Sequence, residues 1–151
     1  MSMLELEFAE ATKEGRLHAK FVRECQWLLL SSPFKRSLPH GINVDALIIL
    51  DFDAEKRLAK VEILEARRHW HKKLCWPLSE KVIEADLKIV DCSKPDRLIE
   101  LAIWIGAEGK RVDVRIGSGS PDRLVRLSDS VLAVMDRKRL IGFSLQVADL
   151  M

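Results

Sequence analysis

An apolar run that ends at two aspartates constrains the fold most, because a fainter copy of it closes the chain. Leu47 to Leu50 are consecutive apolar residues, which is typical of a strand buried on both faces. Residues 54–57 are polar and suit a tight turn. Residues 58–64 then place apolar side chains on one face and mostly polar ones on the other. We therefore predict a β-hairpin over 45–64, with one face buried.

The segment 129–146 repeats this pattern near the end of the chain. Its apolar run is Val131 to Met135, and a turn one residue shorter follows at 136–138. The positions expected to face inward after the turn are Ile141, Phe143, Leu145 and Val147. This segment is predicted to be a second hairpin with the same buried side.

The two halves can be aligned beyond the hairpins, at offsets of 81 to about 85 residues. An internal repeat sets the topology of a chain. We expect two diverged repeats of about five antiparallel strands each, related by a pseudo-twofold axis. The alternative is chance similarity between two β-rich segments, since few residues are identical. The aligned segments are 15–17 with 96–98, 27–30 with 112–116, 31–33 with 118–121, and Asp45 with Asp129.

The hairpin pattern resembles a small bacterial family called domain of unknown function 2283. The repeat of that family reads hydrophobic-Asp-Tyr-Asp, a turn glycine, then hydrophobic-Gly-Ile-Glu-Ile. Segments 49–53, 61–63 and 140–143 fit this pattern, whereas Lys56 stands at the turn glycine and Ala59-Lys60 replace the hydrophobic-Gly pair. The resemblance implies a fold and a bacterial source, and it implies no activity.

The remaining segments complete a mainly β, or β-rich α+β, protein. Residues 4–8 and 17–21 alternate apolar with polar residues and predict an N-terminal hairpin. We expect one compact unit made of a first β repeat at 1–65, a connector helix at 66–77 and a second β repeat at 78–151.

The connector is predicted from a change of period after residue 65. Ala66, Trp70 and Leu74 recur at the spacing of one helix face, and Pro77 ends the run. We expect Trp70 and Leu74 to be buried, and Arg68 and Lys72 to be exposed.

Composition restricts the class of protein. With 48% hydrophobic and 32% charged residues, the chain is typical of a soluble globular protein, and no apolar run approaches the length of a membrane helix. We predict no signal peptide and no membrane anchor. Three widely spaced cysteines are typical of reduced thiols, so we expect a cytoplasmic protein. A net charge of +2 is too small to favour nucleic acid by itself.

One local run is strongly basic and contains an aromatic residue. Its cations could contact phosphates or an acidic partner, and Trp70 could stack on a base. The alternative is the solvated face of a connector helix whose core stripe contains Trp70. The candidate binding residues are Arg67, Arg68, His71, Lys72 and Lys73.

Other polar residues give weaker candidates. Asp51 and Asp53 could form a polar or catalytic site, or could simply cap the hairpin turn. A metal set drawn from His69, His71 and Cys75, completed by Cys25 or Cys92, lacks any recognised ligand spacing. We therefore predict no catalytic residue, no cofactor and no metal.

The function that these patterns favour is a non-enzymatic module that binds a protein or itself, because an open sheet exposes strand edges that need partners. A twofold homodimer is expected; the alternative is a monomer whose edges are guarded by charged residues such as Lys20 and Lys60. Two further alternatives remain open: a nucleic-acid or acidic-partner binder through 67–73, and a small enzyme with its site between the repeats.

Overall fold

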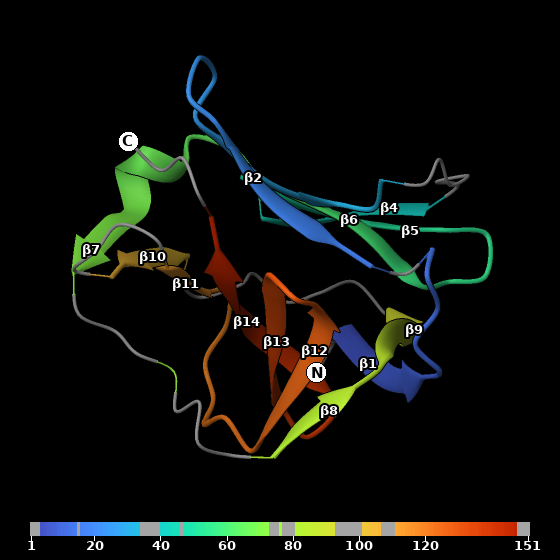
Figure 1. Cartoon of the computed structure of the whole chain (residues 1–151). Coiled ribbons are helices and arrows are strands. Elements are labelled where there is room, and N and C mark those ends of the chain that lie inside the picture. Colours follow the sequence, from blue (N-terminus) through green and yellow to red (C-terminus); the bar gives the residue numbers. More distant parts are fainter. Residues whose placement is uncertain are drawn as a thin grey trace.

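The computed structural model describes residues 4–14, 16–33, 40–45, 47–72, 76, 81–92, 101–106 and 111–147. These residues form two β-sheets and one helical segment, the 3₁₀ helix η1 (Ala66–His69). Figure 1 shows the sheets as two layers, with the small sheet lying over the larger one. The mainly β fold that the sequence predicts is confirmed.

The small sheet has five strands in the order β2-β3-β6-β5-β4, and every neighbouring pair is antiparallel. Its centre is the predicted hairpin, β5 with β6. In the turn, Lys56 has φ of 66°, the left-handed region that favours glycine, at the place where the resembled family carries glycine. The strands are β2 (His18–Val22), β3 (Trp27–Ser31), β4 (His40–Asp45), β5 (Ile48–Phe52) and β6 (Leu58–Ile63).

The larger sheet has nine strands and contains the second predicted hairpin, β13 with β14. Its main path is β7-β10-β11-β14-β13-β12-β8, and β1 joins β9 to β14 beside this path. The strands are β1 (Leu4–Ala9), β7 (Trp70–Lys72), β8 (Val82–Glu84), β9 (Asp86–Cys92), β10 (Ala102–Ile105), β11 (Arg111–Arg115), β12 (Arg123–Ser128), β13 (Val131–Asp136) and β14 (Arg139–Gln146).

Strands β10 to β14, here called the C-terminal unit, have the same order as the small sheet. The order β10-β11-β14-β13-β12 corresponds to β2-β3-β6-β5-β4, and the neighbouring pairs are again antiparallel. The irregularities also correspond, because the β4–β5 and β12–β13 ladders each shift register once, as do β5–β6 and β13–β14. Bulges are features that a shared fold tends to keep. The common origin of the halves stays a prediction.

The hydrophobic core lies between the two sheets. Strand alternation turns Ile48, Leu50 and Phe52 of β5 inward, where all are fully buried. Phe143 of β14 belongs to the same continuous cluster. Burial of one such side chain contributes about 1.5–3 kcal/mol. The two sheets therefore share one core and form one unit.

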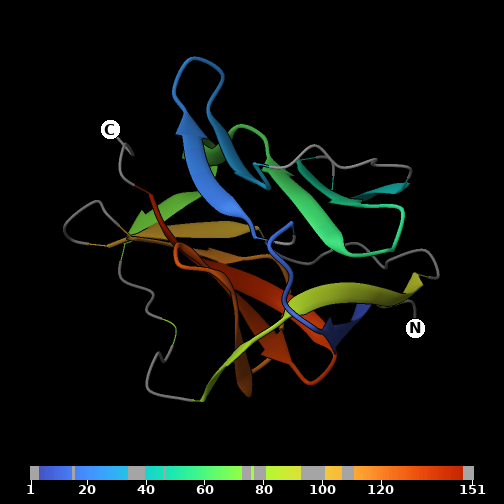
Figure 2. The ribbon, with the colours of Figure 1, turned by 45° about the vertical axis from the view of Figure 1, so that its right-hand side comes forward.

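Strand β1 does not pair with β2, so the predicted N-terminal hairpin is wrong. β1 runs antiparallel to β9 from Leu4↔Cys92 to Ala9↔Asp86, while β2 pairs with β3. Figure 2 shows the dark blue β1 beside the yellow-green β9. The alternation correctly predicted Leu6, Leu17 and Phe21 as buried, but Phe8 on the same predicted face of β1 is exposed. Alternation could not identify the partner, which is set by residues far along the chain.

Residues 66–72 form η1 and β7 in place of the start of the predicted helix. Glu65 has φ of 50° before the short 3₁₀ segment. Trp70 to Lys72 then pair in parallel with Ile103 to Ile105, so their backbone groups serve the sheet instead of a helix. Arg68 and Lys72 are exposed as predicted, whereas Trp70 is only half-buried. Leu74 lies outside the described residues.

Candidate protein-interaction site

The two edges of the C-terminal unit are each covered by an added parallel strand. At one edge β7 pairs with β10, and at the other β8 pairs with β12 along 124–126. An uncovered edge strand presents free N–H and C=O groups that can pair with another chain. Both edges of this unit are thus protected by segments of the same molecule.

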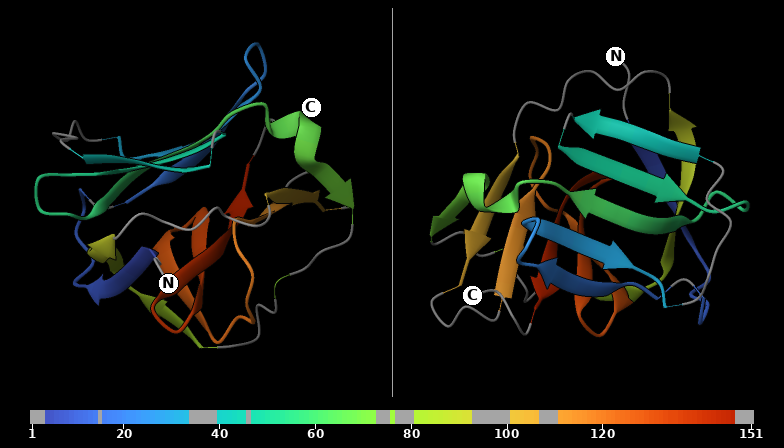
Figure 3. Two further views of the ribbon diagram at one scale, coloured as in Figure 1. Left: turned by 180° about the vertical axis from the view of Figure 1, so that it is seen from behind. Right: turned by 90° about the horizontal axis from the view of Figure 1, so that it is seen from above.

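The corresponding edges of the small sheet, β2 and β4, have no further strand in the part of the chain that the structure describes. Figure 3 (right) shows this sheet face on, with β2 at one edge and β4 at the other. The difference between the two otherwise similar units therefore lies at their edges.

The β2 edge is the more regular of the two. Its ladder with β3 runs without a shift from His18↔Ser31 to Val22↔Trp27. The β4–β5 ladder shifts between Asn43 and Asp45. A bulge twists an edge away from an incoming strand, so β2 offers the better template.

The side chains of β2 divide between the two faces of the sheet. Phe21 is buried toward the core, whereas His18 and Lys20 are exposed on the other face. A surface hollow of about 490 Å³ borders residues 20–24. At the start of β2, the Ser128 hydroxyl donates a hydrogen bond to the carbonyl of Leu17, which fixes the strand to the C-terminal unit. The edge is therefore held in place and also accessible.

Arg67 brings a positive charge next to this edge. Its guanidinium lies 5.5 Å from the centre of the Phe21 ring and 5.7 Å from that of Trp70, and the two rings are 5.4 Å apart. Arg67 is exposed and forms no ion pair within the described ranges. The neighbouring Arg68 is instead paired with Glu65 at 2.8 Å. Arg67 can therefore still accept an acidic partner.

The predicted basic run spans two elements. Arg67 and Arg68 lie in η1, whereas His71 and Lys72 lie in β7, and all four are exposed. The His71 ring lies 5.7 Å from that of Trp104. Lys73 falls outside the described residues. Among the four described candidates, Arg67 is the one that packs on a ring of β2, that of Phe21.

Asp51 and Asp53 have structural roles. The Asp53 carboxylate accepts hydrogen bonds from the backbone N–H groups of Glu55 and Arg57, both at 2.9 Å, and so caps the turn. Asp51 forms an ion pair with Lys60 at 3.5 Å.

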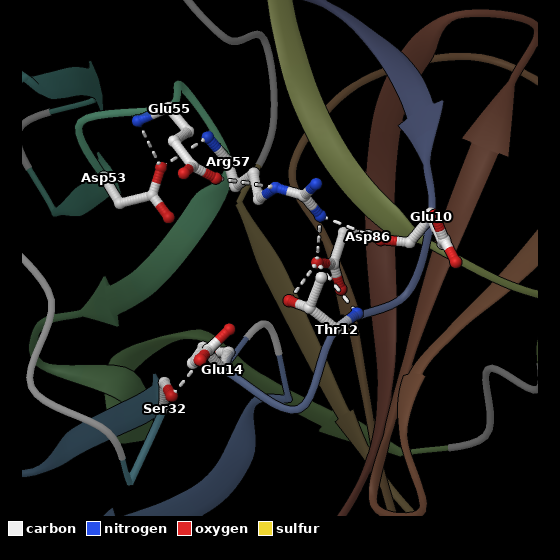
Figure 4. A network of polar contacts seen from close by, with 8 residues as sticks. All are labelled: Glu10, Thr12, Glu14, Ser32, Asp53, Glu55, Arg57 and Asp86. Atoms are coloured by element: carbon white, nitrogen blue, oxygen red, sulfur yellow. Dashed lines mark hydrogen bonds and ion pairs between the residues drawn. The ribbon is translucent and has the colours of Figure 1, made fainter.

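Arg57 fastens this turn to the larger sheet (Figure 4). Its guanidinium donates to Asp86 at 2.6 Å and to the carbonyl of Glu10 at 2.8 Å, and Thr12 Oγ1 donates to the same Asp86 oxygen. Burial lowers the pKa of Arg57, but the hydrogen bond with Asp86 and its charge outweigh that effect and raise it. This network is a brace between the sheets.

A second buried carboxylate, Asp113, lies beneath Trp76. It accepts hydrogen bonds from Ser144 Oγ at 2.8 Å, Arg111 Nε at 3.2 Å and the Trp76 backbone N–H at 3.2 Å. Burial raises its pKa, although these hydrogen bonds oppose the change. Asp113 lies between the apolar residues Val112 and Val114, a pattern that favours a solvent-facing side chain, but Trp76 covers it. With Trp76 and Asp113 both buried, the site is closed to a substrate.

The candidate metal ligands do not come together within the described ranges, where no group of three such side chains is found. His71 is exposed in β7, His69 is half-buried in η1 and Cys25 is an exposed free thiol. Cys75 and the side chain of Cys92 lie outside the described part.

Sequence reasoning missed the β2 edge as a site. Lys20 was noted only as a guard, and Phe21 only as part of a hairpin. The available signal was the repeat itself, because it predicts equivalent edges whose coverage can be compared.

In the described part of the chain, no helix is both long and apolar enough to cross a membrane. Comparison with protein-family models and with curated proteins finds no match for this chain, so the resemblance to domain of unknown function 2283 stays a prediction.

Proposed function

We propose that the protein is a non-enzymatic module that binds a protein or itself through the open edges of its small sheet. The observation that carries this proposal is the contrast between two units of one topology. The C-terminal unit has both edges covered by added strands, whereas β2 and β4 have none within the described residues. Addition of a strand to such an edge is a common mode of peptide recognition.

We also place this module in the bacterial cytoplasm. The odd number of cysteines supports a reducing compartment, and the family resemblance supports a bacterial source. Exposed Cys25 is consistent with a free thiol. Labelling of Cys25 with a thiol reagent in intact cells would test the compartment, and an oxidised Cys25 would contradict it.

Self-association is the homotypic form of the proposal. Large apolar side chains are exposed in both sheets: Trp27 in the small sheet, and Phe8 and Val90 in the larger one. A twofold dimer that buries more than about 1,000 Å² would cover part of this surface. Sedimentation velocity over a range of concentrations tests this form, and a constant mass of 17.3 kDa would rule it out.

The enzyme alternative has no geometric support in the described residues. The space between the sheets is filled by apolar side chains. Asp51 and Asp53 are engaged at one end of the first hairpin, while His71 lies in β7 of the other sheet.

Selection from a display library of random linear peptides tests the binding proposal with the full chain. We expect enriched peptides to slow amide hydrogen exchange in β2 or β4, because pairing protects the edge N–H groups. If neither the enriched peptides nor a dimer protects either strand, the proposal is wrong.

A further inference from the structure

We infer that the β2 edge binds an acidic, extended segment of a partner protein, which adds to the small sheet parallel to β2. This inference rests on the proposed function and specifies the ligand of the same surface. Three observations support it: the parallel strand on the equivalent edge of the C-terminal unit, the charges around β2, and the poor fit of a second copy of the chain to this edge.

The direction of the added strand follows from the equivalent edge. β10 occupies the place of β2, and β7 pairs with it in parallel at Ile103, Trp104 and Ile105. Pairing with the next strand inward shows which residues of β2 and β10 are equivalent. Ile103 is opposite Val114, and Ala19 is opposite Leu30 at the same place in the small sheet. The incoming segment is therefore expected along residues 19–21.

The charge of the segment follows from the cations around this edge. Lys20, Arg23 and Arg67 are exposed, and none has an ion pair in the described part of the chain. Glu24 is the acidic residue next to them. An acidic side chain opposite Lys20 would occupy the position that His71 holds opposite Trp104. Opposite charges across neighbouring strands stabilise pairing, and like charges destabilise it.

A core-side position of the ligand should be apolar. Ala19 is small, half-buried and packed at the margin of the core. On β7 the corresponding place is taken by Trp70, opposite Ile103. We expect the partner segment to alternate apolar residues, which cover Ala19, with acidic residues, which face Lys20.

A second copy of the chain fits this edge poorly. In a twofold antiparallel pair, facing residues lie on the same face of the sheet, so Lys20 can face Lys20, His18 or Val22. The first two registers oppose basic groups. The third places Ala19 opposite Arg23, which lies beyond β2 in the turn and cannot continue the ladder. A foreign acidic strand avoids all three conflicts.

The test uses the full chain with two short synthetic peptides that alternate isoleucine with glutamate or isoleucine with lysine. Fluorescence anisotropy should show the glutamate peptide binding at least about tenfold more tightly, and hydrogen exchange should slow in residues 18–22. Lys20→Glu should reverse the preference. Lys81→Glu, at an exposed lysine beside β8 in the larger sheet, should leave it unchanged, and circular dichroism should show both variants folded.

The direction is tested by a nitroxide at either end of the glutamate peptide. Parallel addition requires the amino-terminal label to broaden the resonances of 17–18 and the carboxy-terminal label those of 22–24. The opposite pattern would overturn the parallel arrangement.

Other outcomes separate this inference from the proposed function. Equal binding of both peptides, or protection of β4 alone, overturns the acidic β2 ligand and leaves a protein-binding module. If a single-stranded oligonucleotide binds more tightly than the glutamate peptide, and Lys20→Glu abolishes that binding, the edge is a nucleic-acid surface. This result also overturns the acidic peptide ligand. If self-association of the chain protects β2 from hydrogen exchange, the ligand is a second copy and the inferred foreign ligand is wrong. If the protein is a monomer and binds no peptide, the proposed function is wrong as well.

Discussion

The brace between the sheets should depend on burial of the Arg57–Asp86 ion pair. The two side chains are 2.6 Å apart and are only 18% and 4% exposed, respectively. Arg57→Met keeps an apolar stem of similar length but removes the charge and the hydrogen bond to the carbonyl of Glu10. The variant leaves Asp86 as a buried carboxylate held by Thr12 alone among the partners described here.

Removal of one member of a buried pair costs about 3–5 kcal/mol. We expect about 2–3 kcal/mol for Arg57→Met, because Thr12 still donates to Asp86 and Arg57 keeps some contact with water. Asp86→Asn should cost less, since the Arg57 charge that remains can be solvated. The double variant should cost less than the sum of the two, with a coupling of about 1–3 kcal/mol.

The matched control is Arg68→Met. Arg68 and Glu65 are 2.8 Å apart, close to the 2.6 Å of the buried pair, but their side chains are 69% and 50% exposed. An exposed pair contributes about 0–1 kcal/mol, so this variant should be nearly neutral. Urea unfolding followed by tryptophan fluorescence measures all the variants. Equal losses at Arg57 and Arg68, or strictly additive losses at Arg57 and Asp86, would refute the reasoning from burial.

Three further predictions concern single positions. The pKa of the Asp113 carboxyl group is raised in the folded state, so the folded protein holds the carboxyl proton more tightly than the unfolded chain does. As the pH falls through that pKa toward 3.8, the stability of the wild type relative to Asp113→Asn should therefore rise. A difference in stability that does not change with pH in urea unfolding would contradict this prediction. Gly142→Ala should cost more than about 2 kcal/mol in the same assay, because its Cβ would overlap the carbonyl oxygen of Val114. Gly106→Ala, whose Cβ would lie 3.4 Å from its nearest atom, should cost little. Asp53→Ala should lower the free energy of unfolding by about 1–3 kcal/mol, because the turn loses its cap. Asp51→Ala should lower it by less than about 1 kcal/mol, because only an ion pair is lost. The reverse order would show that the ion pair of Asp51 matters more than the cap.

Local patterns predicted the two hairpins, but only part of the burial of their strands. Leu47 to Leu50 were expected to be buried on both faces, whereas β5 is fully buried on one face only. Ile141 was expected on the same face as Phe143, but it packs in a separate cluster with Trp76. Residues 47–64 and 131–147 carry their turn and both strands within one short segment, so the sequence contains both partners of each ladder. The predicted repeat implies the same strand order in both halves, although it does not say which order. The order β2-β3-β6-β5-β4 appears in both units.

The failures involve contacts between distant residues. β1 alternates as a strand should, but its partners are near residues 86–92 and 139, which no local pattern indicates. Residues 66–72 have helical spacing, yet pairing with β10 takes their backbone groups. The β2 edge was missed for the same reason, because an edge is defined by what does not pair with it. Arg67 was chosen for its charge, while its position beside Phe21 depends on the fold.

The pairing of β1 has a consequence for how the chain matures during translation. Glu5 lies opposite Arg139, and the N–H of Leu6 donates to the carbonyl of Lys138 at 2.8 Å. The small sheet can assemble as soon as residue 64 has left the ribosome, because all its strands precede that point. β1 is made before any of them, but it cannot pair with β9 until residue 92 has been synthesised, or with β14 until residue 139 has been synthesised. The main partner of β1 is thus made only after every strand of the small sheet, so β1 pairs later than five strands that follow it in the chain.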